Sequence, residues 1–99
     1  MLERDIQRQI LDYLALRRVF HYRQNSGALK AEKGGFVRFG TPGAPDIVCV
    51  IEGQYVGIEV KNEKGRLSSL QEGFRDSLVA AGGKYLVARC LEDVINAGI

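Results

Sequence analysis

The sequence predicts an α/β fold in which helices flank a mixed central sheet. Helical periodicity opens the chain over residues 3–18 and returns over 68–81. Short apolar runs bounded by glycine or proline, which are typical of strands, lie between these helices and after them. Segments that alternate in this way form a sheet covered by helices. We expect the core order α-β-β-β-α-β within a single domain, residues 1–99.

The first half of the chain supplies one helix and several strands. In the first helix, apolar residues recur at helical spacing, at Ile6, Ile10, Tyr13 and Leu14. Residues 19–24 alternate like a strand. The segment 25–44 is rich in glycine and irregular, with one short strand expected over 35–39. Apolar strands are expected over 46–51 and 54–62.

The second half begins with the helix 68–81, in which Leu70, Phe74 and Leu78 form one apolar stripe. Gly82 and Gly83 end this helix, because glycine adopts the left-handed conformation readily. A strand over 84–89 and a short helix over 91–97 complete the fold.

Composition is that of an ordinary globular protein, with 45% apolar and 26% charged residues. No apolar run approaches the roughly 20 residues that span a membrane, and charged residues occupy the N-terminus where a signal peptide would be apolar. We therefore expect a cytoplasmic protein with no membrane partner. Cys49 and Cys90 lie in apolar strand-like runs without CxxC spacing. They are expected to be buried reduced thiols and not a zinc site.

Positive charge is concentrated in one window although the net charge is only +2. Residues 17–38 contain one acidic residue, Glu32, and six basic ones, namely Arg17, Arg18, Arg23, Lys30, Lys33 and Arg38. A flexible basic segment suits a phosphate backbone. A solvated loop is the alternative. Tyr22 and Phe36 in this stretch are expected to be core residues in preference to platforms on which bases stack. His21 is expected to be a sheet or surface residue.

The segment from Asp46 to Lys61 holds the residues that phosphodiester hydrolysis requires. The reaction needs a metal ion that holds the phosphate and lowers the pKa of a water molecule. Carboxylates are the ligands that Mg²⁺ or Mn²⁺ prefers, and Asp46 and Glu59 are candidates. A cation near the developing charge stabilises it, and Lys61 is the candidate.

The register of the two apolar strands decides whether these residues meet. Glu59 and Lys61 are two apart on a strand and therefore share a face. If Gly53 and Gln54 form a two-residue type II′ turn, Asp46 lies opposite Lys61. Glu59 then pairs with Val48, which makes it a diagonal neighbour of Asp46, about 7–8 Å away at the backbone. A three-residue turn would place Asp46 on the other face.

Pro45-Asp46 followed by Glu59-Val60-Lys61 resembles the motif of the PD-(D/E)xK nuclease superfamily. The resemblance extends to Gly43 before the motif, Gln71 on the next helix and Glu3 on the first helix. Together these residues resemble the VRR-NUC branch, the virus-type replication-repair nucleases, over nearly the whole chain. The resemblance implies a restriction-endonuclease-like core and a divalent-metal-dependent, structure-selective DNA endonuclease.

The roles of individual residues follow from this resemblance. It implies that Asp46, Glu59 and the carbonyl of Val60 bind the metal, that Lys61 acts on the attacking water or the developing charge, and that Glu3 and Gln71 complete the site. It also implies a symmetric homodimer that cuts four-way (Holliday) junctions or branched DNA. The residues expected to contact DNA are Arg23, Asn25, Lys30, Lys33, Arg38 and Lys64.

Several alternatives stay open at the level of sequence. Asp46 and Lys61 could be a cross-strand surface pair worth about 0.2–1 kcal/mol. Gln71 is also at the third position of a capping box that begins at Ser68. Glu3 could simply favour the positive end of its helix. At the level of function, the alternative is a nuclease-fold module that binds DNA without cutting it.

Overall fold

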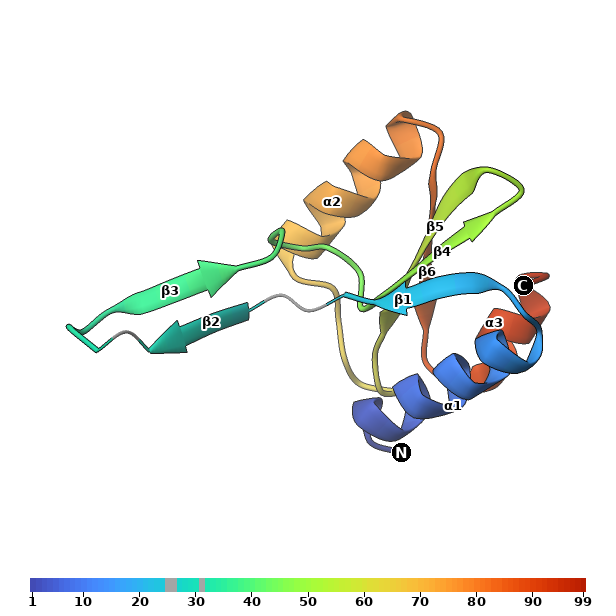
Figure 1. Cartoon of the computed structure of the whole chain (residues 1–99), viewed down its shortest axis with the longest axis horizontal. Coiled ribbons are helices and arrows are strands. Elements are labelled where there is room, and N and C mark those ends of the chain that lie inside the picture. Colours follow the sequence, from blue (N-terminus) through green and yellow to red (C-terminus); the bar gives the residue numbers. More distant parts are fainter. Residues whose placement is uncertain (25–26, 31) are drawn as a thin grey trace.

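The computed structural model describes residues 1–24, 27–30 and 32–99, and only the backbone of 27–30 and 37–39. Three helices and six strands are found there (Figure 1). Their order is α1 (Glu3–Leu16), β1 (Phe20–Arg23), β2 (Gly27–Lys30), β3 (Phe36–Phe39), β4 (Ile47–Ile51), β5 (Gln54–Val60), α2 (Ser69–Ala80), β6 (Lys84–Ala88) and α3 (Leu91–Asn96). The predicted α/β class is confirmed, and most element bounds lie within two residues of those expected.

Four strands form the central sheet in the order β1-β4-β5-β6. The pairs β1–β4 and β4–β5 are antiparallel, whereas β5 and β6 are parallel, so the sheet is mixed as expected. A parallel pair needs a long crossover connection, and α2 supplies it between β5 and β6. The carboxyl ends of β5 and β6 therefore meet at one edge of the sheet.

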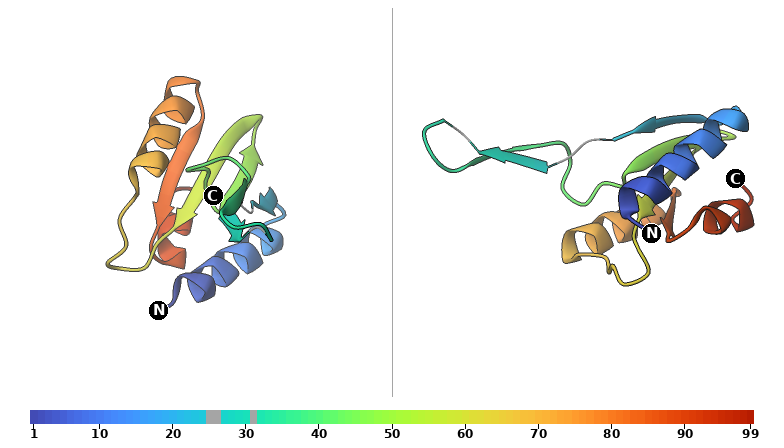
Figure 2. Two further views of the ribbon diagram at one scale, coloured as in Figure 1. Left: turned by 90° about the vertical axis from the view of Figure 1, so that its left-hand side faces the viewer. Right: turned by 90° about the horizontal axis from the view of Figure 1, so that it is seen from below.

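Helices cover both faces of the sheet, but unequally (Figures 1 and 2). On one face α1 packs against β1 and β5 and α3 against β6, and together they bury the core, which includes Ile6, Ile10, Leu14, Ile47, Ile58, Val60 and Val94. On the other face lies α2, which has no buried residue. Phe74 and Leu78 are half-buried there, whereas Leu70, expected on the same stripe, is 55% exposed. The second face is therefore only partly closed, which leaves room for a site.

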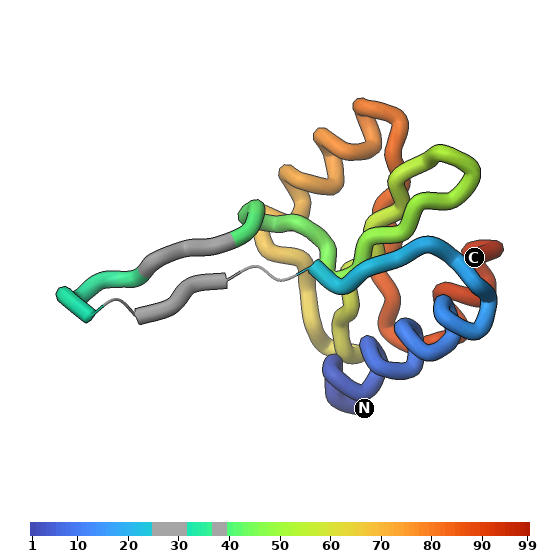
Figure 3. Tube along the Cα trace, viewed as in Figure 1, coloured from blue at the N-terminus to red at the C-terminus, as the bar shows by residue number. Residues whose placement is uncertain are grey.

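The hairpin of β2 and β3 stands apart from this sheet. The two strands pair with each other, Gly27 with Phe39 and Lys30 with Phe36, and with no strand of the central sheet. The hairpin projects from the body of the molecule in Figure 1 and in the right view of Figure 2, and Figure 3 follows the Cα trace from the same side as Figure 1. Only β3 was expected from the sequence. β2 was missed because Gly27-Ala28-Leu29-Lys30 lacks alternation of apolar and polar residues.

The turn between β4 and β5 has two residues, but they are Glu52 and Gly53 and not Gly53 and Gln54. Both have positive φ, 51° and 78°, as in a type I′ turn, so the type II′ prediction is wrong. Gln54 instead pairs with Ile51, and its side-chain amide donates to the carbonyl of Gly82 at 2.8 Å. This contact fixes Gln54 as the first residue of β5.

The shifted turn changes the partners of every residue in the two strands. Ile47 pairs with Ile58 and Val48 with Gly57. The predicted pairs, Val48 with Glu59 and Asp46 with Lys61, are therefore wrong. Continued by one residue, the register places Asp46 directly beside Glu59. The shift is by two residues, so both carboxylates keep the same face of the sheet.

Several smaller expectations are settled by burial. Cys49 is buried and Cys90 half-buried, both as free thiols, and burial raises the pKa of the Cys49 thiol to about 11. Tyr22 and Phe36 are exposed, so the expectation that they are core residues is wrong: β1 is an edge strand and β3 lies in the projecting hairpin. His21 is half-buried with Nδ1 at 2.7 Å from the carbonyl of Val19, a structural role. Among the described residues, no helix has the length and apolar character needed to cross a membrane.

Candidate active site

Asp46 and Glu59 lie side by side where β4 begins and β5 ends. The Oδ2 atom of Asp46 accepts a hydrogen bond of 2.8 Å from the backbone N–H of Val60. This bond holds the Asp46 side chain across the gap between the two strands, at the level of Glu59. The two acidic side chains, which are 13 positions apart in the chain, thus share one site.

Pro45 has a specific consequence for the backbone at this point. The register places Pro45 opposite Val60, and proline has no N–H to donate. Strand β4 therefore offers no donor to the Val60 carbonyl, which lies on the same side of β5 as the N–H that meets Asp46. A backbone oxygen without a ladder partner, next to two carboxylates, is a suitable third ligand for a hard cation.

Glu59 is the buried acidic residue of the site, with 3% of its surface exposed. Its Oε1 atom is buried and has no hydrogen-bond partner among the described residues. Burial, followed by a hydrogen bond to Asp46 and the negative charge of Asp46, raises the pKa of Glu59 to about 8. A buried carboxylate with an oxygen atom that lacks a partner is costly, so a cation or a proton at this point would be stabilising.

Lys61 follows Glu59 on the same face and is half-buried. Its positive charge opposes the rise in the pKa of Glu59. Its backbone N–H donates to the carbonyl of Ala88 at 3.1 Å, which continues the pairing of β5 with β6 past Val60. The ammonium group is thus carried by a backbone that the sheet fixes, close to the carboxylates.

Glu3 reaches the edge of this site from the first turn of α1. Its Oε2 atom accepts a hydrogen bond of 3.2 Å from the backbone N–H of Asn62. Its negative charge adds a smaller contribution to the raised pKa of Glu59. Glu3 therefore fastens the segment after Lys61 and is near the two other acids, but its carboxylate is already engaged.

Gln71 forms the capping box that the sequence allowed. Its Oε1 atom accepts from the N–H of Ser68 at 2.9 Å, and the Ser68 hydroxyl accepts from the N–H of Gln71 at 3.2 Å. Because the Oε1 atom of Gln71 is used in the capping box, its amide nitrogen is the atom that would serve the site. Gly43 holds this helix end next to the Pro45-Asp46 segment, because a Cβ at Gly43 would lie 2.2 Å from the carbonyl oxygen of Leu70.

Tyr85 belongs to the site and was missed from the sequence. It pairs with Gly57 in the parallel ladder, on the face that carries Glu59. Its hydroxyl is buried and, among the described residues, without a hydrogen-bond partner. Burial and then the charges of Glu59 and Asp46 raise its pKa above the ordinary range. No motif marks Tyr85, because only the pairing of β5 with β6 brings it near Glu59.

The predicted DNA-contacting residues fall into two groups. Arg23, Lys33 and Lys64 are exposed, as contact with DNA requires. Asn25 lies outside the described residues, and for Lys30 and Arg38 only the backbone is described. Lys33 lies between the strands of the hairpin, whereas Lys64 lies in the loop after Lys61, so the two are on separate parts of the molecule.

The donor set fits one divalent cation better than a larger metal centre. Among the described residues, no group of three or more His, Cys, Asp or Glu side chains is placed to share an ion. Asp46, Glu59 and the Val60 carbonyl supply hard oxygen donors, and Glu59 Oε1 lacks any other partner. In comparison with known proteins, the sequence matches no protein-family model and no curated protein.

Proposed function

We propose that the protein is a divalent-metal-dependent DNA endonuclease that hydrolyses phosphodiester bonds, with four-way junctions or other branched DNA as substrate. The observation that carries the proposal is the pairing of Asp46 with a buried Glu59 whose Oε1 atom has no partner, on the face that also carries Lys61. The likeness of this motif to that of the VRR-NUC nucleases supports the same function, and so does a fold with a mixed sheet between helices.

The chain's own residues would divide the work. Asp46, Glu59 and the Val60 carbonyl would hold Mg²⁺ or Mn²⁺, which when bound polarises the phosphate and lowers the pKa of a water molecule. The Lys61 ammonium would orient the attacking water or stabilise the negative charge that develops on the phosphate. Gln71 would position Lys61 or a water through its amide nitrogen, and Glu3 would hold the backbone of Asn62 beside the site.

One observation favours the alternative of a DNA-binding module that does not cut. Among the described residues, no group of three or more His, Cys, Asp or Glu side chains is placed to share an ion, and Glu3 instead accepts a hydrogen bond from the N–H of Asn62. Against this alternative, the two carboxylates and Lys61 are all present on one face, and a buried Glu59 has no purpose in simple DNA binding. We therefore favour the enzyme, and we place it in the cytoplasm.

Incubation with defined DNA substrates tests the proposal. Purified protein is mixed with a four-way junction, a nicked flap and a plain duplex, each with Mg²⁺, Mn²⁺ or EDTA. We expect metal-dependent cleavage of branched DNA in preference to the duplex. The double variant Asp46→Asn/Glu59→Gln, purified in parallel, controls for contaminating nucleases. No cleavage of any substrate, with DNA binding retained, would favour the non-cutting module.

The same proposal includes a symmetric homodimer. Leu16, Phe20 and Phe36 are 81%, 66% and 74% exposed, so they do not pack internally and are candidates for the dimer interface. Val19 instead packs against the core, and the side chain of Phe39 lies outside the described residues. Strand β1 is an edge of the sheet, where a second copy can cover Phe20.

Light scattering at micromolar concentration tests the dimer. A dimer has twice the mass of the 11.0 kDa chain. It should make paired nicks on opposite strands of a four-way junction, because two symmetric sites face two equivalent strands. Phe20→Ser is expected to weaken the dimer without unfolding the protein, since the side chain is exposed. A monomer with and without DNA contradicts the dimer and leaves the nuclease chemistry untouched.

A further inference from the structure

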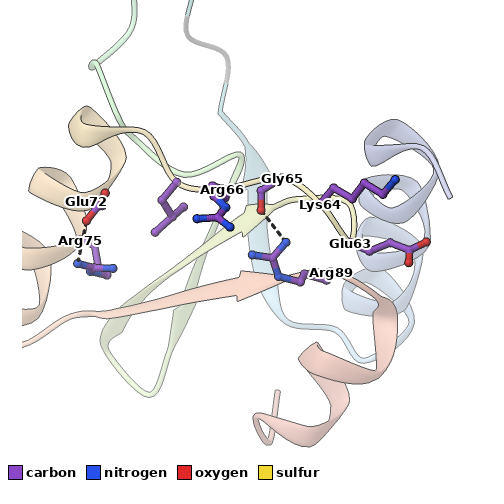
Figure 4. Close-up of a pocket in the computed structure, with 8 residues that line it drawn as sticks. Glu63, Lys64, Gly65, Arg66, Glu72, Arg75 and Arg89 are labelled. Carbon is purple, nitrogen blue, oxygen red and sulfur yellow. Dashed lines mark hydrogen bonds and ion pairs between the residues drawn. The ribbon is translucent and has the colours of Figure 1, made fainter.

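A cleft of about 690 Å³ opens beside the candidate active site. That volume lies within the range of roughly 300–1,000 Å³ typical of ligand pockets. The cleft is formed by the loop after β5, the start of α2 and the end of β6, and we call it the arginine cleft (Figure 4). The residues that line it are Glu63, Lys64, Gly65, Arg66, Leu67, Glu72, Arg75 and Arg89.

The first part of the loop that forms one wall, Asn62 to Gly65, is fastened by hydrogen bonds. The side-chain oxygen of Asn62 accepts from the backbone N–H groups of Lys64 and Gly65, at 3.0 and 2.8 Å. Nη1 of Arg89 donates to the carbonyls of Asn62 and Gly65, each at 2.7 Å. This part of the wall is therefore held in shape before any ligand arrives, which lowers the entropic cost of binding.

Arg89 keeps its positive charge available while it holds this loop. Its two hydrogen bonds go to backbone carbonyls, which carry no net charge. An arginine has five N–H donors, so those on Nη2 and Nε remain. Among the described residues, the only ion pairs are those of Arg75 with Glu72 and Asp76, which leaves the charges of Arg66, Lys64 and Arg89 without a carboxylate within 4.0 Å.

The arginine cleft continues the edge of the sheet that carries the active site. Val60 pairs with Ala88, so Lys61 and Arg89 are the next residues on two adjacent parallel strands. Arg66 lies between Arg89 and the Glu72–Arg75 pair (Figure 4). In α/β sheets, ligands bind outside the carboxyl ends of parallel strands, and this cleft is at that edge.

We propose that the arginine cleft binds the DNA backbone on one side of the bond to be cut, through Arg66, Arg89 and Lys64. The inference rests on the proposed function for the choice of DNA as ligand. Phosphodiester groups suit these residues because arginine presents planar donors to phosphate oxygens. The contacts are sequence-independent, so they position the strand next to Asp46 and Glu59 and do not select bases.

The test measures DNA binding without cleavage. Affinity for a labelled four-way junction and a plain duplex is followed by fluorescence anisotropy in EDTA over a series of salt concentrations. Arg66→Gln is the informative variant, because Arg66 is exposed and its loss does not release the loop. Lys84→Gln is the matched control, since Lys84 is exposed at the opposite end of β6.

We expect Arg66→Gln to weaken binding several-fold and to reduce the slope of log K against log[salt] by about one unit, as loss of one phosphate contact does. Lys84→Gln should leave both unchanged. Equal behaviour of the two variants would overturn the arginine cleft as a DNA site, even if the protein cleaves DNA. Conversely, binding that depends on Arg66 in a protein that never cleaves would overturn the nuclease and leave the cleft standing.

Discussion

The carboxylate of Asp46 accepts a hydrogen bond of 2.8 Å from the backbone N–H of Val60. This one contact joins the start of β4 to the end of β5 and brings Asp46 beside Glu59. The register places Pro45 opposite Val60, and proline has no N–H to donate to the Val60 carbonyl. The Pro-Asp pair thus does two things at once: proline leaves the Val60 carbonyl without a partner, and aspartate satisfies the N–H.

Lys61→Ala is expected to lower kcat by roughly 10²–10³-fold, the usual effect of losing one group that stabilises charge in a transition state. DNA affinity should stay within several-fold of wild type, because Lys61 is one cation among several. Single-turnover cleavage and anisotropy measure the two effects separately. Lys84→Ala, at the far end of β6, is the control. Unchanged turnover would remove Lys61 from the mechanism.

Stability of the metal-free protein should depend on pH through Glu59. Its pKa is raised from 4.5 to about 8, so the folded state binds the proton more tightly than the unfolded state. This contribution to stability is fully present below pH 4.5 and is lost as the pH rises to about 8. We expect Tm to fall between pH 5 and pH 8.5 in EDTA, and Glu59→Gln to flatten the fall. If Tm falls equally in the variant, the pH dependence comes from another group.

Metal affinity should show the opposite trend with pH. At pH 6 a metal ion must displace the proton on Glu59, which lowers the metal affinity. Near pH 8 or above this displacement costs little free energy, because the pKa of Glu59 is about 8. Calorimetry with Mn²⁺ should therefore report rising affinity and falling proton release from pH 6 to pH 9. Asp46→Asn and Glu59→Gln should each abolish the tight site. Wild-type affinity in either variant would end the ligand assignment.

Gly43→Ala should destabilise the protein more than Gly53→Ala. The two glycines have almost the same φ, +79° and +78°, so the conformational strain of alanine is matched. Only at Gly43 would the new Cβ meet backbone, 2.2 Å from the Leu70 oxygen, whereas at Gly53 nothing lies within 4 Å. The excess loss of stability in urea unfolding measures this contact. Activity should fall as well, because the clash pushes α2 away from Asp46.

Tyr85→Phe is expected to stabilise the metal-free protein by about 1–3 kcal/mol, since it removes a buried hydroxyl that has no partner among the described residues. Phenylalanine keeps the ring, and with it the contact to Phe74 at 6.4 Å between centroids. Urea unfolding of both proteins gives the difference. A loss of stability would show instead that a buried water satisfies the Tyr85 hydroxyl.

The sequence predicts the elements of this fold well and their register less well. The face shared by Asp46 and Glu59 follows from the two-residue periodicity of strands, which survives a shift by two. The position of the turn does not follow, because Glu52 adopts a positive φ that local preference disfavours, and the contact from Gln54 to Gly82 crosses 28 residues. The pattern of apolar and polar residues in the sequence does not reveal tertiary contacts of this kind.

The same reason limits what could be foreseen of the site. Asp46, Glu59 and Lys61 could be predicted because a Pro-Asp pair followed by a Glu-x-Lys triplet carries them. Tyr85 and Arg89 join them only through the parallel pairing of β5 with β6, which no spacing encodes. The capping box of Gln71 was visible from the sequence, but whether its amide nitrogen also serves the site depends on Gly43 and the approach of α2.

The backbone N–H of Gln24 donates to the carbonyl of Asp46 at 2.8 Å, so the chain leaves the sheet and re-enters it at the same point. This hydrogen bond therefore closes the base of the segment that carries the β2–β3 hairpin. Each doubling of the length of such a loop raises the free-energy cost of closing it by only about 0.6 kcal/mol. Evolution can thus exchange the hairpin for one of another size while the carboxylates stay in place, which separates the reach of the protein from its chemistry.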